Sequence, residues 1–258
     1  SIRGFFVIIL DMKHEVFWKN PGYKPRPALR GDIECDYLIV GGGVTGVSTA
    51  YFLAKYGAKD VVLIEKNEVA SGATSKAAGT LVIRGESDLA DIIAKYGEKK
   101  GRVYWNEIHE GLRDIKRIVK DENIDCDAEP QDTLYCDYRH RHLVNLHEEY
   151  LAEKSVEAGT KFLAKNELQK EINTPLFAHG ILSENHGFSV NPLALTQNLS
   201  KAIEKYGVKI YENTALINFE NGTAKTTGVN IKYKKLIMAI DADHPAKEVK
   251  NLKSTIAV

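Results

Sequence analysis

The sequence predicts an α/β protein with a doubly wound, mainly parallel sheet that is interrupted by a segment of α+β character. Three observations predict this class. Residues 36–66 have the pattern of a strand, a glycine-rich turn, a helix and a second strand that ends in an acid. Strand and helix signals alternate again from residue 192 onwards, and the stretch between these two regions is less regular.

Composition excludes several classes of protein. The 258 residues are 43% hydrophobic, which is enough for a substantial core, and 35 basic residues balance 35 acidic ones. No overall field therefore favours nucleic acid or an anionic membrane. Three cysteines form neither a CxxC pair nor an even disulfide framework, which favours free thiols and a cytoplasmic location.

Histidines give no strong metal signal. The eight histidines include no HExxH motif, but His140, His142 and His147 gather on one expected helix. Metal ligation needs further ligands that the sequence does not place, so a polar helix face is the better interpretation. We expect no metal site.

The first strand, Tyr37–Val40, is short, rich in branched residues and followed by glycine, as is typical of a buried parallel strand. Gly41, Gly43 and Gly46 then follow the spacing GxGxxG. The first glycine permits a tight turn, the second lets the backbone approach a pyrophosphate, and the third lets the next helix pack closely. Phosphates can then reach the unpaired amides of that helix.

The following helix begins at Val44 and is expected to end near Gly57. Val61–Ile64 is the second strand, and Glu65 stands at the distance where an acid receives ribose hydroxyls. Glycine clusters also make ordinary loops, and Glu65 is alternatively an exposed strand-end carboxylate. The agreement of order and spacing favours a Rossmann-like dinucleotide-binding unit.

The N-terminal region is expected to precede this unit as an extension. The apolar run Phe5–Leu10 is too short to span a bilayer, and Met12 follows it closely. We expect Met12 to be the natural start, with a strand or a truncated signal as the alternative. Lys19–Arg30 contains three prolines and is an extended lead-in to the first strand.

The middle of the chain carries mixed signals. Ala70–Thr80 is a segment of small residues with hydroxyls that could turn over a bound cofactor. A helical region from 89 to 120 is expected to break near Gly97 and Gly101. Further elements are expected as strands at 133–136 and 178–183, and as helices at 139–157 and 168–172.

The C-terminal part returns to regular alternation. Pro192 introduces an amphipathic helix that stops at Gly207. Strands at 208–211 and 215–219, a hairpin turn at Asn221-Gly222 and a strand at 235–240 follow. These boundaries predict an extension and lead-in (1–31), a first part of the nucleotide-binding domain (32–97), an inserted helical and substrate-domain segment (98–185) and a second part of the nucleotide-binding domain (186–258).

Four pieces of this sequence resemble the FAD-dependent oxidoreductases of the D-amino-acid oxidase family, which includes glycine oxidase and sarcosine oxidase. The pieces are DYLIVGGGVTGVSTAYFLA with VVLIEK, SGATSKAAG, HGFSVNPLALTQNLSKAIEKYGVKIYENTAL, and KKLIMAIDA. The third piece is the most specific, and the resemblance covers most of 32–243. The lead-in with Phe17-Trp18 is also similar to gamma-glutamylputrescine oxidase-type members.

The resemblance implies that FAD is the cofactor. Gly41, Gly43 and Gly46 would hold its pyrophosphate, Glu65 would hold the adenosine ribose, and Lys66 would sit beside that ribose. The residues that would line the phosphate, ribityl and flavin approaches are Ser71, Thr74, Ser75 and Gly79, although an ordinary polar loop is the alternative.

Further positions are implied with less specificity. Leu216 matches the position that brackets adenine, and Ala239 matches the small residue of the late strand near the cofactor. Asp241 stands where many members have glycine, so the turn there is uncertain. Arg84 is one candidate for holding a substrate carboxylate, although an exposed surface arginine is the better interpretation. No catalytic residue is assigned.

The resemblance also implies a reaction, in which a hydride leaves the carbon next to an amine and the resulting imine is hydrolysed. The substrate would be a small amine or amino acid. Alternatives are a noncatalytic FAD-binding subunit that needs a partner chain, and an NAD-dependent dehydrogenase. Since members of the family generally continue further, we expect a C-terminally truncated enzyme with little activity alone. A homo-oligomer or a partner subunit stays open.

Overall fold

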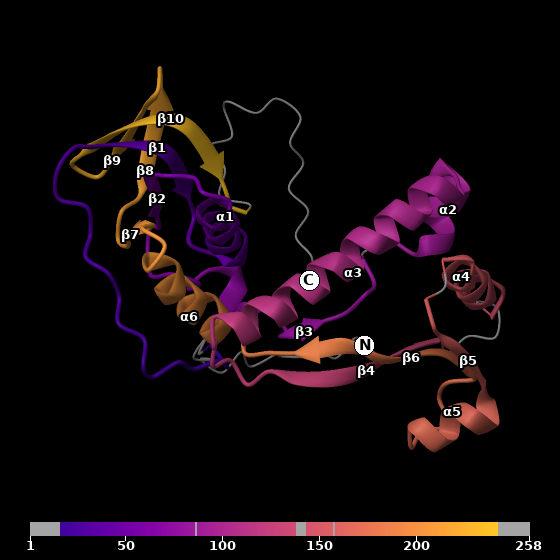
Figure 1. Cartoon of the computed structure of the whole chain (residues 1–258). Helices are drawn as coiled ribbons and strands as arrows, with labels where there is room; N and C mark the ends of the chain where they lie inside the picture. Colours follow the sequence, from indigo (N-terminus) through magenta and orange to yellow (C-terminus); the bar gives the residue numbers. More distant parts are fainter. Residues whose placement is uncertain (1–15, 86, 138–142, 157, 242–258) are drawn as a thin grey trace, which may run out of the picture.

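The computed structural model describes residues 16–85, 87–137, 143–156 and 158–241. The described residues form two separate sheets, and the long helix α3 (Glu98–Asp121) crosses the region between them (Figure 1). The first sheet carries the glycine-rich turn. The expected extension at residues 1–11 and the start at Met12 lie outside the described residues.

The first sheet is mainly parallel, as predicted. Its six strands lie in the order β7 (Lys209–Tyr211), β2 (Val61–Ile64), β1 (Ile33–Val40), β10 (Asn230–Met238), β9 (Thr223–Thr226) and β8 (Leu216–Glu220). The first four are mutually parallel, and β9 and β8 extend the sheet as an antiparallel pair. Such an arrangement is that of a Rossmann-like unit with an added meander.

Both faces of this sheet are covered. Helices α1 (Val44–Lys55) and α6 (Pro192–Glu204) pack against each other on one face. On the other face, Leu38 and its buried neighbours pack against Leu29 of the lead-in and against side chains of the antiparallel pair. Strand β1 is therefore buried on both sides, which explains its run of apolar residues.

The second sheet is antiparallel and supplies the α+β segment. Strand β6 (His179–Ser189) lies at its centre with β4 (Glu129–Asp137) along one edge. The short strands β3 (Thr80–Leu81) and β5 (Lys161–Ala164) pair with opposite ends of β6 along the other edge. The associated helices are α2 (Leu89–Tyr96), α4 (Leu143–Ser155) and α5 (Lys165–Glu171), and η1 (Ala73–Lys76) is a short 3-10 turn.

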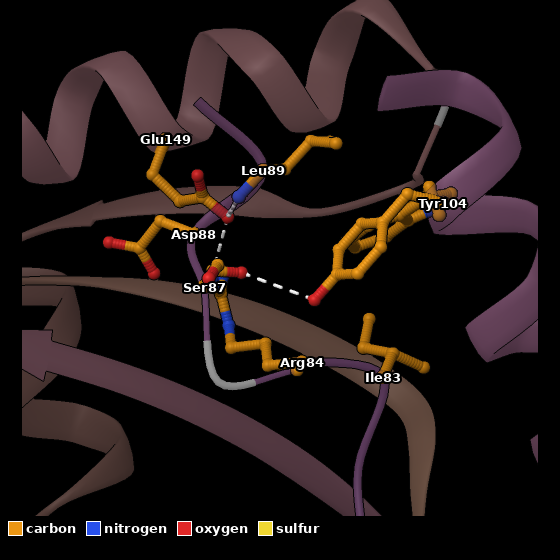
Figure 2. A pocket seen from close by; sticks show the side chains of 9 residues that line it. Ile83, Arg84, Ser87, Asp88, Leu89, Tyr104 and Glu149 are labelled. Carbon is orange, nitrogen blue, oxygen red and sulfur yellow. Dashed lines mark hydrogen bonds and ion pairs between the residues drawn. The ribbon is translucent and has the colours of Figure 1, made fainter. Parts of the chain in front are cut away.

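Helix α2 depends on a residue that is distant in sequence. Asp88 occupies its N-cap position without a capping side-chain hydrogen bond. Glu149 on α4 instead accepts hydrogen bonds from the amide of Leu89 at 3.1 Å (Figure 2) and from the amide of Ala90 at 2.8 Å. A carboxylate at this end of a helix also interacts favourably with the helix dipole. Helix α4 is thereby tied to the start of α2.

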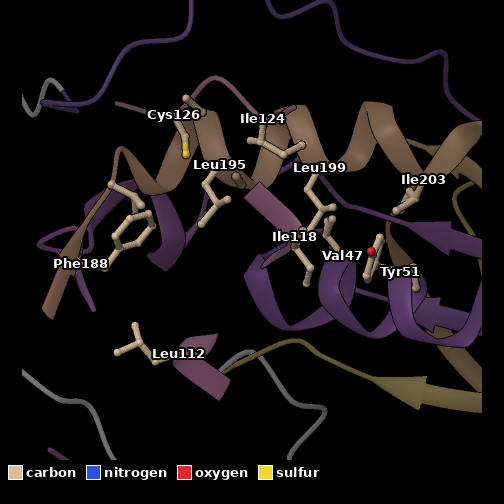
Figure 3. Packing of buried hydrophobic residues seen from close by; sticks show 14 of the residues in the cluster. Val47, Tyr51, Leu112, Ile118, Ile124, Cys126, Phe188, Leu195, Leu199 and Ile203 are labelled. Atoms are coloured by element: carbon tan, nitrogen blue, oxygen red, sulfur yellow. The ribbon is translucent and has the colours of Figure 1, made fainter. Parts of the chain in front are cut away.

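The main core joins the two sheets through α3. Val47 and Tyr51 of α1, Ile118 of α3, and Leu195 and Leu199 of α6 belong to one buried cluster (Figure 3). The last turn of α3 thus packs with the helices that cover the first sheet, while its first turns pack against α2. None of the described helices is long and apolar enough to cross a membrane.

Several sequence predictions are confirmed and others need correction. The helical region breaks at Gly97, whose φ is +86°, but Gly101 lies within α3 and allows close packing against Ile93. The hairpin at Asn221-Gly222 is confirmed, with positive φ at both residues. The sequence does not predict strands β3, β5 and β9, because each has four residues or fewer. In addition, β9 directly follows a turn and β5 directly precedes helix α5.

Other boundaries differ in extent. Strand β10 begins at Asn230 rather than 235, because the lysine-rich part pairs along β1 with alternate residues exposed. Strand β6 runs on to Ser189, well beyond the predicted 183. The helix expected at 139–157 is described only from Leu143 to Ser155, so His140 and His142 lie outside the described residues. The predicted domain boundaries stay predictions.

Candidate functional site

The glycine-rich turn is closely packed between β1, α1 and the end of β10. Gly41 has φ +109°, and a Cβ there would lie 2.1 Å from the carbonyl oxygen of Ala239. A Cβ on Gly46 would lie 1.9 Å from the carbonyl oxygen of Gly41. The amide of Ala239 donates to the carbonyl of Val40 at 2.8 Å, and this bond holds the ends of β1 and β10 together. Only glycine fits at both positions.

Helix α1 begins directly after this turn with its N-terminus open. Gly43 is the N-cap residue and has no side chain to cap the first amides. The amide of Val44 donates to Thr74 Oγ1 at 3.1 Å. The first-turn amides and the helix dipole together form a site for an anion, and Thr74 brings a hydroxyl to the same place. This donor set fits a pyrophosphate.

Glu65 lies at the carboxyl end of β2, beside the same turn. Its Oε2 accepts from the amide of Gly42 at 2.7 Å, and its Oε1 accepts from the amide of Asn67 at 2.9 Å. These bonds fix the carboxylate while each oxygen keeps a further acceptor position. The arrangement fits a ribose diol, which offers two hydroxyl donors. Lys66, the next residue, is exposed.

The hydroxyls of the segment after β2 serve different purposes. Ser71 Oγ donates to the carbonyl of Glu68 at 2.7 Å, and the buried Ser75 Oγ bonds to the carbonyls of Ser71 and Gly72. These two serines therefore shape the segment itself. Of the three hydroxyl residues that the sequence singled out here, Thr74 is the one bonded to the start of α1.

Gly79 closes the same segment. Its φ is +79°, and a Cβ there would lie 2.4 Å from the carbonyl oxygen of Val190. The amide of Val190 donates to the carbonyl of Gly79 at 2.8 Å, so the segment joins the end of β6 at this point. A larger residue at Gly79 would separate this segment from the end of β6.

A cavity of about 160 Å³ lies beneath this segment and beside the start of α1. Thr74, Ala77 and Gly79 line it from the segment, and Val44 and Val47 line it from α1. Apolar side chains of α3 and α6 complete its wall. The polar turn and the apolar cavity are thus adjacent, as a ligand with both an anionic and a flat uncharged part would need.

The two positions implied farther along the chain also lie at this edge of the sheet. Leu216 is half-buried at the start of β8, and the amide of nearby Thr214 donates to the carbonyl of Glu65 at 2.8 Å. Ala239 contacts the glycine turn directly. Asp241 has φ +51°, so it adopts the left-handed conformation for which glycine is the usual residue. The substitution therefore preserves the turn.

Arg84 is not an exposed surface residue, and that interpretation is wrong. Only 13% of its side chain is exposed, and its guanidinium lies 4.3 Å from the ring centroid of Tyr135. It forms ion pairs with Glu149, at 3.1 Å, and with Glu153 (Figure 2 shows the first). Both acids come from α4, which the sequence could not place beside Arg84. Two buried acidic side chains thus occupy its guanidinium, which does not favour a role with substrate.

Sequence reasoning missed two residues that contact the segment above the cavity. The indole Nε1 of Trp18 donates to the carbonyl of Ala77 at 2.8 Å. Glu212, with no exposed surface, accepts from the amide of Val69 at 2.6 Å. The aromatic pair in the lead-in and the acid after β7 were the available signals. Among the described residues, no group of three or more His, Cys, Asp or Glu side chains is arranged to hold a metal ion.

Comparisons with known proteins find similar sequences over most of the chain. The sequence model of a family described as FAD dependent oxidoreductase matches residues 36–255. Gamma-glutamylputrescine oxidoreductase of Escherichia coli (strain K12) is 30% identical over 226 residues, which are 85% of this chain and 52% of that protein. A Bacillus subtilis (strain 168) protein, named for a Rieske 2Fe-2S iron-sulfur protein, is 32% identical over 81% of this chain and 40% of its own length.

Solved structures show the same fold. L-Amino acid deaminase from Proteus myxofaciens, determined in complex with anthranilate, superimposes with a TM-score of 0.68 and 21% identity. The match covers 87% of this chain and 48% of that one. The chain thus spans about half or less of the length of these similar proteins.

Proposed function

Because this chain belongs to the D-amino-acid oxidase family of FAD-dependent oxidoreductases, we propose that it oxidises the C–N bond of an amino acid or a secondary amine. The observation that carries the proposal is the turn at the start of α1. Glycines that exclude any side chain, an uncapped helix N-terminus and the fixed carboxylate of Glu65 converge there. These groups match the phosphates and ribose of a dinucleotide.

FAD is the cofactor of the family, and the residues present fit it. Gly41, Gly43 and Gly46 would let its pyrophosphate reach the amides of α1, with Thr74 as an additional polar contact. Glu65 would accept from the adenosine ribose. When bound, the flavin accepts the hydride equivalent that leaves the substrate. The cavity below Ala77 and Gly79 offers a mainly apolar environment next to this end of the site.

The substrate class is proposed from chemistry and from the similar proteins. A C–H next to an amine nitrogen gives up a hydride, the nitrogen gives up a proton, and the product is an imine. Water hydrolyses this imine to a carbonyl compound and either ammonia, from a primary amine, or an amine, from a secondary one. The names of two similar proteins refer to a glutamylated diamine and to an L-amino acid. Arg84 is not proposed as the partner of a substrate carboxylate, because its guanidinium already contacts Glu149 and Glu153.

The test starts with the visible absorbance spectrum of the purified chain after incubation with FAD and removal of the free cofactor. Bound flavin is expected. Since little activity is expected of this chain alone, anaerobic bleaching on addition of an amine or amino acid should be slow. Gly46→Ala should abolish flavin binding, whereas Gly111→Ala, on an open face of α3, should not. Glu65→Gln keeps the shape of the side chain and should weaken flavin binding. This variant tests the site even if Gly46→Ala fails to fold.

Three results would contradict the proposal. A chain that binds NAD and not FAD is a nicotinamide-dependent dehydrogenase. A chain that binds FAD but is reduced by amines only after a separate protein is added is a noncatalytic FAD-binding subunit. Binding that survives both Gly46→Ala and Glu65→Gln would show that the turn is not the nucleotide site.

A further inference from the structure

The lead-in at residues 16–30 does more than deliver the chain to β1. It leaves the neighbourhood of β3 and α6 and passes around the outside of the first sheet (Figure 1). Asn20 Nδ2 donates to Gln197 Oε1 on α6 at 3.1 Å, and Asn191 Nδ2 donates to the carbonyl of Lys19 at 3.0 Å. The lead-in is an extended segment that forms no helix or strand itself. These bonds hold it against the body of the protein.

The first anchor of the lead-in lies at the end of the segment 69–79. The indole Nε1 of Trp18 donates to the carbonyl of Ala77 at 2.8 Å. The ring also covers Gly79, where a Cβ would lie 2.8 Å from Trp18 Cζ2. Phe17 packs edge-on against the same ring, with 5.0 Å between centroids. Trp18 therefore supports from outside the two residues that line the cavity from inside.

The second anchor lies at the start of the same segment. Glu212 has no exposed surface, and its Oε1 accepts both from the amide of Val69, at 2.6 Å, and from the hydroxyl of Tyr23, at 2.5 Å. Its Oε2 accepts from the amide of Arg26. One buried carboxylate thus joins the lead-in to the chain that follows Glu65. Burial and the bond to Glu212 raise the pKa of Tyr23, so its hydroxyl stays a donor.

A third link passes through α6. Gln197 Nε2 donates to the carbonyl of Val69 at 3.1 Å, and its Oε1 accepts from Asn20. Both the amide and the carbonyl of Val69 are therefore bonded to groups that the lead-in contacts. The serines of the segment stabilise only its internal turn. Its position relative to α1 therefore depends on these outside contacts, on Thr74 and on backbone hydrogen bonds made near its two ends by Ala70 and Gly79.

We propose that the lead-in is a clasp, anchored at Trp18 and Glu212, that holds segment 69–79 in the position required to bind FAD. The inference rests on the proposed cofactor site but assigns a role to residues that precede the nucleotide-binding fold. Trp18 and Glu212 are positioning residues, because they act through Ala77, Gly79 and Val69. The two anchors have separable effects, since Val69 lies near Glu65 while Gly79 lies at the cavity.

The experiment compares the dissociation constants of FAD and of ADP, which contains only the nucleotide half of the cofactor. Trp18→Ala is expected to weaken FAD at least tenfold and to change ADP less than twofold, with Trp18→Phe intermediate for FAD. Glu212→Gln is expected to weaken both ligands. Glu204→Gln is the matched control, because it removes the ion pair between the exposed Glu204 and Arg26 on the same lead-in without touching segment 69–79.

A second measurement needs no ligand. Hydrogen–deuterium exchange of the amides of 70–79 is expected to accelerate in Trp18→Ala, with the amides of β1 and β2 unchanged. If the wild-type chain binds FAD, unchanged exchange or unchanged FAD affinity in Trp18→Ala would overturn the clasp and leave the cofactor site intact. A Glu204→Gln variant that weakens FAD as strongly as Trp18→Ala would also overturn it. A wild-type chain that binds neither FAD nor ADP would instead overturn the proposed function.

Discussion

Glu149 Oε1 lies 3.1 Å from Arg84 Nη1, and the same carboxylate caps the first two amides of α2. A single buried side chain of α4 thus compensates a buried charge and completes a helix terminus. Only 2% of it is exposed. Buried charges are tolerated only when they are paired and hydrogen-bonded, so this contact is required for the packing of α2 and α4 against the second sheet.

We expect Glu149→Ala to lower the free energy of unfolding by about 3 kcal/mol, because Arg84 loses a partner in a buried site and two amides lose their acceptor. Chemical denaturation monitored by circular dichroism measures this change. Glu148→Ala, at an exposed position of the same helix, should change stability by less than about 0.5 kcal/mol. Equal effects of the two substitutions would contradict the assigned role.

Glu153 should give the protein a stability that falls as the pH rises. Burial, opposed in part by Arg84, raises the pKa of Glu153 from 4.5 to about 7. The native state therefore holds this proton more tightly than the unfolded chain. Its contribution is fully present below pH 4.5, is lost between pH 4.5 and 7, and amounts to at most about 3 kcal/mol. Urea unfolding at several pH values should show this slope, and Glu153→Gln should flatten it.

Two glycines of α3 should respond in opposite ways to alanine. A Cβ on Gly101 would lie 2.4 Å from Ile93 Cγ1, so Gly101→Ala should destabilise the protein by about 1–3 kcal/mol through crowding between α2 and α3. Nothing lies within 4 Å of a Cβ on Gly111, and Gly111→Ala should stabilise the helix by up to about 1 kcal/mol. Thermal melts of both variants measure the difference, and a shift of the same sign in both would refute it.

The hydroxyl of Thr74 should matter for cofactor affinity more than for folding. Thr74→Val removes the acceptor for the amide of Val44 and a polar group beside the start of α1. FAD binding should weaken about tenfold, the equivalent of about 1.4 kcal/mol, while Thr74→Ser should bind normally. Flavin fluorescence titration provides the measurement. Thr49→Val is the control, because that hydroxyl bonds to the carbonyl of Thr45 within α1.

Asp241 offers a test of backbone conformation. Its φ of +51° is unfavourable for any residue with a Cβ and especially for a branched one. Asp241→Gly should be neutral or stabilise by up to about 1 kcal/mol, and Asp241→Val should destabilise by about 1–2 kcal/mol. Equilibrium unfolding of the two variants decides, and a valine variant as stable as the glycine variant would exclude the left-handed conformation.

The glycine-rich unit illustrates what could be predicted. Gly41, Gly43, Gly46 and Glu65 form a local pattern in which strand, turn, helix and acid occur within 30 residues, and the structure brings them together at one edge of the sheet. The insertion was harder to predict. Strand β5 is only four residues long, and its pairing with β6 depends on residues that are some 20 positions away. Short elements of this kind have too little local signal.

The sequence by itself determined the type of fold and the nucleotide-binding unit, because these depend on the backbone conformations that each residue allows and on hydrophobic periodicity, which act over a few residues. The family followed from the resemblance of four pieces of sequence to known members. Only the tertiary structure decided that Arg84 is paired with α4, that Ser75 serves its own turn and that Trp18 covers Gly79. In each case the side chain contacts residues that the fold places beside it, and the local spacing of residues in the sequence does not reveal these contacts. The free energy of burying a charge or a hydrogen-bonding group depends on that environment.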